Sequence, residues 1–327
     1  MISLQQISIG YQKNKPLLKG VNLRADRGEM IALVGRNGTG KSTLFRSILG
    51  LIPFLEGECL LNGKPLQQFN HRVRARTISY VSSQVARLPS IAVRELVSLG
   101  RMPYTGWNGR LGKEDQNMVE KAIREVGMGN FMERNLDQLS DGERQRVMIA
   151  RALVQDTPVM VLDEPAAYLD IPNTFGLVRI LSKFRDQGKT VLYSTHDLET
   201  AMMLADKFWV IDEGRVYEGS PEDLGLSGLF DSLFETSGIA FDLDSGRFRY
   251  PLQPRGGIHL SGAPDQALAW TRRAMERLGF DETQGEGSTR IEVSSGESGF
   301  QWKMIGNGKE EIYGSIYKLA RFLTQDV

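Results

Sequence analysis

Residues 35–43 read GRNGTGKST and match the pattern G-x-x-x-x-G-K-[ST]. A short apolar run at residues 30–34 precedes this stretch, and apolar residues at helical spacing follow it over residues 44–49. The sequence therefore predicts a buried strand, a glycine-rich loop and a helix over residues 30–50. Gly50 is a natural end for that helix.

A loop between a strand and a helix is suited to binding phosphate groups. Its glycines let successive backbone N–H groups point inward, Lys41 brings a positive charge to the β- and γ-phosphates, and the Ser42 hydroxyl ligates Mg²⁺. The alternative is a glycine-rich turn with a solvated lysine, which requires neither the strand nor the helix. The residues predicted to contact the nucleotide are Gly35, Asn37, Gly38, Thr39, Gly40, Lys41, Ser42 and Thr43.

Two carboxylates follow a second apolar run. Residues 159–162 read VMVL, and Asp163 and Glu164 come directly after them. A Mg²⁺ ion beside the phosphates needs a carboxylate at the end of a neighbouring strand, and Asp163 has that position. Glu164 would then face the γ-phosphate and polarise water. Taken alone, the pair is also compatible with ordinary carboxylates at a strand end.

Composition and length limit the remaining classes of protein. The chain has 327 residues, which suggests about two domains, and 41% of its residues are apolar. Forty basic and forty acidic residues balance, so a strongly basic nucleic-acid binder is not expected. Cys59 is the single cysteine, which excludes an intramolecular disulfide. Without a signal-peptide pattern or an apolar run of membrane-spanning length, we expect a soluble cytoplasmic protein.

Strands and helices alternate through the first two thirds of the chain, which indicates an α/β fold. Near residue 225 the pattern changes. A hairpin is predicted over residues 241–250, a helix from Pro264, and strands at 290–293 and 299–305. Apolar residues from Ile312 to Leu323 predict a closing helix, with Tyr313 and Tyr317 beside its apolar face and Phe322 off it. These aromatic residues would either complete a small core or contact a second copy of the chain.

The segment LSDGERQR at residues 139–146 is similar to the L-S-G-G-Q signature of ATP-binding cassette (ABC) transporter ATPases. Other motifs of that family occur in the family's order. Tyr11 matches the aromatic residue that stacks on adenine, Gln84 the Q-loop glutamine, Asp170 the D-loop aspartate and His196 the switch histidine. The resemblance covers about residues 1–225. Taken alone, Tyr11 would be a strand aromatic, Gln84 a surface residue and His196 a structural histidine.

The resemblance implies an α/β P-loop nucleoside triphosphatase domain at residues 1–227. That domain would contain a RecA-like core, an antiparallel β subdomain and a helical subdomain at about 85–155. A small α+β domain without an assignable motif would occupy residues 228–327. ATP would be held between the phosphate loop of one subunit and the signature of a second copy, arranged head to tail.

The resemblance also implies a role for each matched residue. Glu164 would act as the general base, His196 would hold the γ-phosphate, and Lys41 and Gln84 would complete the catalytic set. Mg²⁺ would be bound by Ser42, Gln84 and Asp163. The nucleotide contacts outside the phosphate loop would be Tyr11, Ser140, Gly142 and Asp170.

The signature departs from the family pattern at two positions. Asp141 stands where glycine is usual, and its carboxylate would repel the γ-phosphate bound by the partner subunit. Glu143 replaces the final glutamine. Together with Ser140 it forms an S-x-x-E capping box, which is compatible with a helix N-terminus that binds phosphate. In addition, Ser83 precedes Gln84 where proline is common.

Residues 99–107 read LGRMPYTGW and resemble a stretch in the ATPases of bacterial iron–siderophore, haem and cobalamin importers. The resemblance implies an ATP-hydrolysing subunit, peripheral at the cytoplasmic face of the membrane. Its partners would be a membrane permease and, indirectly, a periplasmic or surface substrate-binding protein. The alternatives are an ATPase of another transport system, a soluble ABC-type ATPase, or a kinase with the same loop. Residues 103–107 would otherwise be a local turn with a packed aromatic ring.

Overall fold

The structure is a computed structural model in which the chain divides into two compact units. The first comprises residues Met1–Leu233 and Leu243–Arg247, and the second comprises Phe234–Asp242 and Phe248–Val327. Each unit is described by itself. The described residues are 1–12, 14–83, 90–167, 169–234, 238–243, 246–250, 252–283, 289–296, 299–306 and 309–325.

A six-stranded sheet forms the centre of the first unit, in the order β10-β9-β3-β8-β7-β6. Its strands are β3 (Met30–Gly35), β6 (Ile78–Val81), β7 (Val159–Leu162), β8 (Thr190–Ser194), β9 (Lys207–Asp212) and β10 (Arg215–Gly219). All pair in parallel except β10. Every residue of β7 and β8 is buried, as expected for strands covered on both faces.

This topology collects the ends of distant segments at one edge of the sheet. Because β3, β7 and β8 are parallel and adjacent or nearly so, their carboxyl ends lie side by side. The segments that follow them begin at Arg36, Asp163 and Thr195. In open parallel sheets this edge is where ligands bind.

A separate antiparallel sheet lies beside the phosphate loop, in the order β2-β1-β4-β5. Its strands are β1 (Ile2–Ile9), β2 (Leu18–Ala25), β4 (Glu56–Leu61) and β5 (Lys64–Pro65). One hydrophobic core joins the two sheets through helix α1 (Lys41–Ile48), whose Leu44, Phe45 and Ile48 are fully buried. The predicted α/β fold with an additional antiparallel sheet is confirmed.

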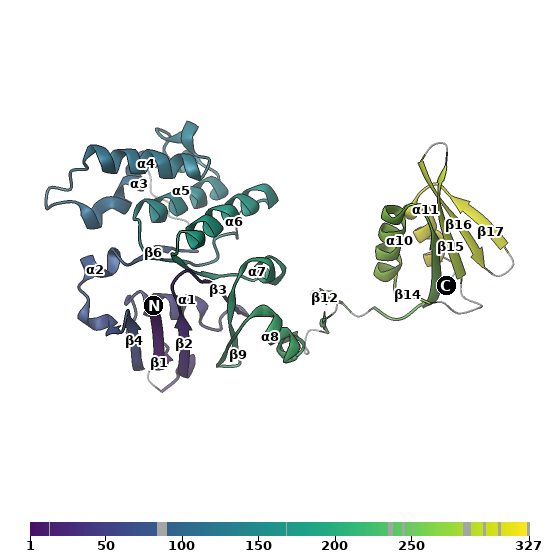
Figure 1. The fold of residues 1–327 in the computed structure, drawn as a ribbon, viewed down its shortest axis with the longest axis horizontal. Coiled ribbons are helices and arrows are strands. Elements are labelled where there is room, and N and C mark those ends of the chain that lie inside the picture. Colours follow the sequence, from purple (N-terminus) through teal and green to yellow (C-terminus); the bar gives the residue numbers. More distant parts are fainter. Residues whose placement is uncertain are drawn as a thin grey trace. The chain divides into compact units, whose positions relative to one another are not determined.

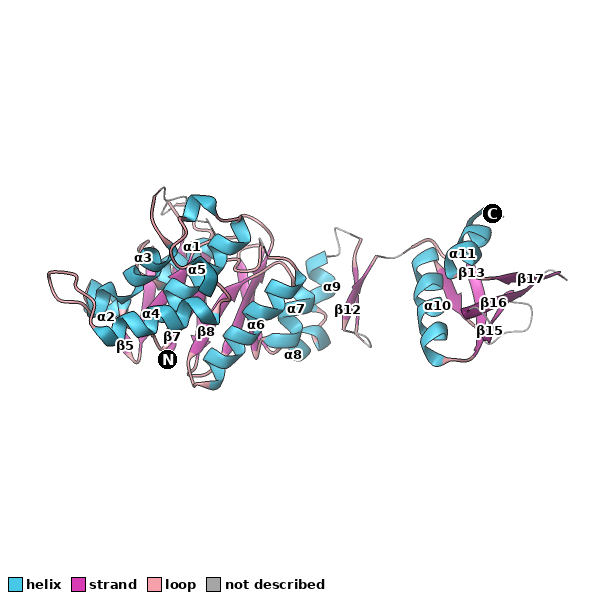
Figure 2. Ribbon diagram, turned by 90° about the horizontal axis from the view of Figure 1, so that it is seen from above, coloured by secondary structure: helices cyan, strands magenta, loops and turns pink. Residues whose placement is uncertain are grey.

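The helices cover the sheet and form a layer of their own, which Figures 1 and 2 show beside the sheet. The layer consists of α3 (Val93–Ser98), α4 (Lys113–Glu125) and α5 (Asp141–Val154), with the short 3-10 helices η2 (Leu99–Tyr104), η3 (Gly129–Phe131) and η4 (Leu136–Gln138) between them. The remaining helices are η1 (Leu66–Gln68), α2 (His71–Ala75), α6 (Ile171–Asp186), α7 (Leu198–Leu204), α8 (Pro221–Leu226) and α9 (Leu229–Phe234). None of the helices in the described residues is long and apolar enough to cross a membrane.

The second unit is an α+β fold with a five-stranded sheet in the order β14-β13-β15-β16-β17. Its core includes Trp302, whose indole N–H donates to the hydroxyl of buried Thr271 at 2.7 Å. The elements are β11 (Ala240–Asp242), β12 (Arg247–Arg249), β13 (Gly256–Gly262), α10 (Asp265–Leu278), β14 (Phe280–Glu282), β15 (Thr289–Gly296), β16 (Gly299–Gly306), β17 (Lys309–Tyr313) and α11 (Ile316–Gln325). The tip of the predicted hairpin, residues 244 and 245, lies outside the described residues.

The prediction of the closing helix is wrong about the residue at which the helix begins and about which aromatic residues face the core. Ile312 and Tyr313 belong to strand β17, where Tyr313 pairs with Trp302 of β16, and α11 begins only at Ile316. The sequence pattern missed the strand because so short a segment fits the period of a helix as well as that of a strand. Phe322 is not off the apolar face. It packs against the core, with its ring centroid 5.7 Å from that of Tyr313.

Candidate functional site

The loop between β3 and α1 is shaped by close backbone contacts. A Cβ at Gly35 would lie 2.8 Å from the carbonyl oxygen of Ile211 on the neighbouring strand β9, so this position has no room for a side chain. Gly40 has a φ of +107° at the N-terminal cap of α1, a backbone conformation that favours glycine. The first turn of α1 leaves N–H groups without acceptors within the helix. The loop therefore presents a concave row of donors that fits a phosphate group.

The ammonium group of Lys41 lies inside this loop. Lys41 is 5% exposed, and its Nζ donates to the carbonyl oxygens of Gly35 at 2.7 Å and Arg36 at 3.2 Å. Burial lowers the pKa of Lys41, while the nearby carboxylates of Glu164 and Asp163 act in the opposite direction. Among the residues that the structure describes, this buried cation has hydrogen bonds only to neutral carbonyl groups, so it is well placed to take up an anionic ligand.

Three more of the residues predicted to contact nucleotide, Tyr11, Thr39 and Thr43, have hydroxyl groups in hydrogen bonds at the loop. The hydroxyl groups of Tyr11 and Thr43 are 3.3 Å apart, and Tyr11 is 70% exposed. The tyrosine ring therefore stands at the open side of α1, where a flat aromatic ligand can stack on it. The Thr39 hydroxyl donates to the carbonyl oxygen of Arg36 at 2.8 Å and holds the loop closed on itself.

The Ser194 hydroxyl, at the end of β8, joins both predicted carboxylates after β7. It donates to Oδ1 of Asp163 at 2.7 Å, and it accepts the backbone N–H of Glu164 at 2.9 Å. Asp163 is fully buried, and its other oxygen accepts from the Ser83 hydroxyl at 3.3 Å. A buried carboxylate requires such donors because desolvation otherwise disfavours its charge. Ser194 was not among the site residues predicted from the sequence, although a serine that ends a buried strand is a usable signal.

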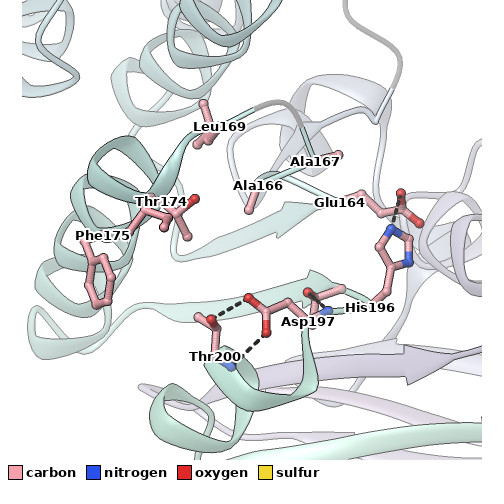
Figure 3. A pocket seen from close by; sticks show the side chains of 11 residues that line it. Glu164, Ala166, Ala167, Leu169, Thr174, Phe175, His196, Asp197 and Thr200 are labelled. Carbon is pink, nitrogen blue, oxygen red and sulfur yellow. Dashed lines mark hydrogen bonds and ion pairs between the residues drawn. The ribbon is translucent and has the colours of Figure 1, made fainter. Parts of the chain in front are cut away.

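Glu164 and His196 meet at the exposed side of the same edge. Nε2 of His196 lies 3.1 Å from Oε2 of Glu164, and the histidine side chain is 54% exposed (Figure 3). Glu164 has a φ of +50°, which is uncommon for a residue with a side chain. Its N–H bond to Ser194 holds this conformation in place. The structure thus brings Lys41, Asp163, Glu164 and His196 to one edge of the sheet.

A pocket of about 330 Å³ opens beside this pair, between the start of α6 and the start of α7 (Figure 3). Asp170 caps α6 by accepting the N–H of Asn173 at 3.0 Å, and Asp197 caps α7 in the same way through Thr200. Ile171 and Phe175 of α6 line the pocket, yet they are 74% and 59% exposed. This side of the site is open, with apolar side chains facing outward.

The residues around Ser140 behave differently, because their contacts are local. Ser140 Oγ accepts the N–H of Glu143, and the Glu143 carboxylate accepts the N–H of Ser140 at 2.8 Å, which forms the predicted capping box of α5. Gly142 lies in the first turn of the same helix. Within the described residues, Ser140 has no hydrogen bond to the phosphate loop. Gln84 falls outside the described residues.

The carboxylate of Asp141 is held by a cation. It accepts a hydrogen bond from the guanidinium of Arg144, three residues on, in the first turn of α5. A negative charge at a helix N-terminus is itself favourable. This pairing weakens the expectation that Asp141 repels a bound phosphate, since much of its charge is compensated within its own helix.

The residues present are compatible with a Mg²⁺ ion whose remaining coordination positions are taken by phosphate oxygens and water. Ser42 and Asp163 offer hard oxygen donors beside the phosphate loop. Among the described residues no group of three or more His, Cys, Asp and Glu side chains could hold a metal. Mg²⁺ commonly uses one or two protein oxygens together with phosphate oxygens and water, so a sparse protein donor set is compatible with it.

Comparison with known proteins gives two family matches. Residues 18–167 match the family "ABC transporter", and residues 255–324 match "Iron ABC transporter C-terminal domain". The iron(3+)-hydroxamate import ATP-binding protein FhuC of Bacillus subtilis is 35% identical, over 68% of this chain and 85% of that protein. The zinc transport system ATP-binding protein TroB of Treponema pallidum is also 35% identical, over 67% of this chain and 81% of that protein.

A solved structure shows the same architecture. The dimeric ATP-binding cassette MJ0796 bound to ADP and Pi matches with a TM-score of 0.62 and 27% identity, over 67% of this chain and 98% of that one. Its match covers a length comparable to that of the first unit.

Replacing Ser194 with alanine tests whether its hydroxyl is needed to position Asp163 and Glu164. Ser194→Ala removes a hydrogen bond to a buried carboxylate, which is worth about 1.5–3 kcal/mol, so we expect ATP hydrolysis to fall roughly 10- to 100-fold. The Mg²⁺ concentration for half-maximal activity should rise as well. Ser47→Ala is the matched control, because the Ser47 hydroxyl is buried and has no hydrogen-bond partner among the described residues. Equal rates of ATP hydrolysis by Ser194→Ala and Ser47→Ala would contradict the positioning role assigned to Ser194.

Replacing Asp141 with glycine tests whether its carboxylate repels the bound γ-phosphate or stabilises the N-terminus of α5. Because Arg144 and the helix N-terminus both stabilise this carboxylate, we expect Asp141→Gly to destabilise the protein by about 0.5–2 kcal/mol. ATP-dependent dimerisation should weaken or stay unchanged, as measured by analytical ultracentrifugation. Tighter dimerisation of the variant would mean that the carboxylate repels the nucleotide after all.

Proposed function

Because the chain belongs to the ABC transporter family of ATP-binding proteins, we propose that it hydrolyses ATP as the energising subunit of an importer for an iron complex. The observation that carries the proposal is the combination of domains. An ATP-binding cassette is followed, at residues 255–324, by a segment that matches the iron ABC transporter C-terminal domain. We assign the cassette to residues 1–227 and the accessory domain to residues 228–327.

The substrate class rests on this C-terminal match and on the names of relatives. FhuC acts in iron(3+)-hydroxamate import, which favours a chelated ferric ion, that is, an iron–siderophore or a similar complex. TroB acts in zinc transport at the same identity, so a bare divalent metal is the competing substrate. A haem or cobalamin complex is a further alternative, since its importer would use the same kind of ATP-hydrolysing subunit. In each case a membrane permease and a separate substrate-binding protein would contact the substrate.

The site supports the following binding mode for ATP. The adenine ring stacks on Tyr11 beside α1, and the phosphates lie in the loop from Gly35 to Thr43, with Lys41 at the β- and γ-phosphates. Mg²⁺ would be held by Ser42, Asp163 and Gln84. When bound, it neutralises charge on the phosphates and so favours departure of the leaving group.

Glu164 and His196 are positioned to handle the attacking water. Glu164 accepts a proton from water while the water oxygen forms a bond to the γ-phosphorus. The bond from that phosphorus to the bridging oxygen breaks, ADP leaves with the electron pair, and the proton passes on to phosphate. His196, whose Nε2 lies 3.1 Å from Oε2 of Glu164 in the structure, would hold a γ-phosphate oxygen and align the water.

A second copy of the chain would complete this site. Ser140, Gly142 and Asp170 make only local contacts among the described residues, and they belong to helix N-termini suited to anions. MJ0796 is dimeric in its solved form. We therefore propose a head-to-tail dimer in which the signature of one subunit closes over the phosphate loop of the other. ATP stabilises the closed state, and hydrolysis releases it.

Replacing Glu164 with glutamine tests the catalytic assignment. The variant keeps the size and the backbone of the residue but cannot accept the proton, so ATP hydrolysis should fall about 10²- to 10⁴-fold. ATP binding should persist and trap the dimer. Glu58→Gln, at an exposed position of β4, is the matched control. Steady-state turnover within about threefold of the native chain would rule out Glu164 as the general base, since that role contributes far more.

The transport assignment is tested by capture from membranes. The Glu164→Gln variant, loaded with ATP, is used to capture partners from native membranes, and the captured proteins are identified. We expect a multi-span permease, with a substrate-binding protein that binds a ferric complex more tightly than zinc. Peripheral attachment to the cytoplasmic face would follow from that permease. Capture of a zinc-selective system would transfer the assignment to the competing substrate, and hydrolysis without any permease would favour a soluble ATPase.

A further inference from the structure

An apolar crevice lies in the first unit between helices α6 and α7 and the strands β3 and β8. Its volume is about 40 Å³, and it adjoins the larger pocket beside Glu164 and His196, with which it shares five lining residues: Ala166, Thr174, Thr195, Asp197 and Thr200 (Figure 3). We propose that this crevice binds a small, mainly apolar molecule with one hydrogen-bond acceptor, such as a carbonyl oxygen, and that its occupancy slows ATP hydrolysis. The binding step stands by itself, whereas the effect on hydrolysis rests on the proposed function.

Most of the crevice wall is apolar. Helix α6 contributes Leu177, Val178 and Leu181 to it, and helix α7 contributes Ala201 and Leu204. An apolar group that enters the crevice is therefore removed from water, which is favourable. The adjoining pocket, with a volume of about 330 Å³, has room for the part of a molecule that is too large for the crevice itself.

The hydroxyl of Tyr193 is the group that specifies an acceptor. The Tyr193 side chain lines the crevice and is 6% exposed, and its hydroxyl has no hydrogen-bond partner among the residues that the structure describes. A buried polar group without a partner is costly. Burial raises the pKa of Tyr193, so the phenol keeps its proton and can donate it. The Asp197 carboxylate also lines the crevice, but it accepts its hydrogen bonds from the N–H and the hydroxyl of Thr200. An acceptor that enters the crevice would give Tyr193 a partner.

The crevice touches both segments that carry the proposed catalytic pair. Ala166 of its wall lies two residues after Glu164, and Thr195 of its wall directly precedes His196. In the structure the His196 imidazole lies 3.1 Å from the Glu164 carboxylate, whereas hydrolysis would require it to hold the γ-phosphate. A molecule that binds this arrangement favours it over the other, because a ligand shifts an equilibrium toward the state that it binds better. Occupancy would therefore slow hydrolysis without competing for the phosphate loop.

The experiment uses the full chain and two probe molecules of the same shape. Acetophenone has an apolar ring and a carbonyl oxygen that can accept the Tyr193 hydroxyl. In α-methylstyrene a methylene group replaces that oxygen, so it is the matched control ligand. The dissociation constant of each probe is measured by nuclear magnetic resonance titration, and the unfolding temperature of each protein variant is measured alongside.

We expect the native chain to bind acetophenone about three- to tenfold more tightly than α-methylstyrene, which is what one neutral hydrogen bond contributes. Tyr193→Phe should bind the two probes equally. Tyr217→Phe, on strand β10 and outside the crevice, is the matched control and should keep the preference. Because Tyr193→Phe removes a buried hydroxyl that has no partner, this variant should unfold at the native temperature or above it.

The effect on hydrolysis is measured with the same probe. Saturating acetophenone should lower the rate of ATP hydrolysis by the native chain and leave its affinity for ATP unchanged. Val178→Phe places a ring in the crevice, so this variant should neither bind acetophenone nor respond to it.

Absence of acetophenone binding, or equal binding of the two probes to the native chain, would overturn the site. A lower unfolding temperature of Tyr193→Phe would overturn it as well, since the hydroxyl would then already have a partner such as an ordered water. Binding that leaves hydrolysis unchanged would overturn the effect on hydrolysis alone. A native chain that binds acetophenone through Tyr193 but does not hydrolyse ATP would uphold the site and contradict the proposed function.

Discussion

The buried carboxylate of Asp163 is the group on which the arrangement of the site depends. A fully buried charge is costly unless donors face it, and here the hydroxyls of Ser194 and Ser83 do so. The same Ser194 oxygen accepts the N–H of Glu164, and Glu164 contacts His196. One hydroxyl thus ties the end of β8 to the residues after β7. The parallel sheet places the loop with Lys41 at the same edge, so the site is prepared before nucleotide binds.

The site is complete on one side and open on the other. The phosphate loop and the carboxylates face one another within a single chain, whereas Ser140 and Gly142 cap their own helix. The open side carries exposed apolar residues, Ile171 and Phe175. Such a division is what a site shared between two copies requires, because binding energy from the nucleotide can then drive closure. ATP handling and assembly would be coupled through the same few residues.

Motifs with a fixed chemistry were predictable from the sequence, and weakly patterned segments were not. The strand–loop–helix around Lys41 and the capping box of Ser140 are confirmed, because glycine positions and cap residues leave few alternatives. Strand β17 was missed and Ile312 misassigned, since five residues fit either period. Ser194 was missed because its importance comes from a neighbour 31 residues away in sequence. Only the pairing of β7 with β8 brings the two together.

Calorimetric titration of ATP in the presence of Mg²⁺, into the native chain and into Lys41→Ala, tests the central claim most directly. The claim is that the buried ammonium of Lys41 is held ready for phosphate. Since hydrogen bonds to charged groups are worth about 1.5–3 kcal/mol, the account predicts that the native chain binds ATP and that the variant binds it at least roughly tenfold more weakly. Equal affinities, with both proteins folded, would contradict it.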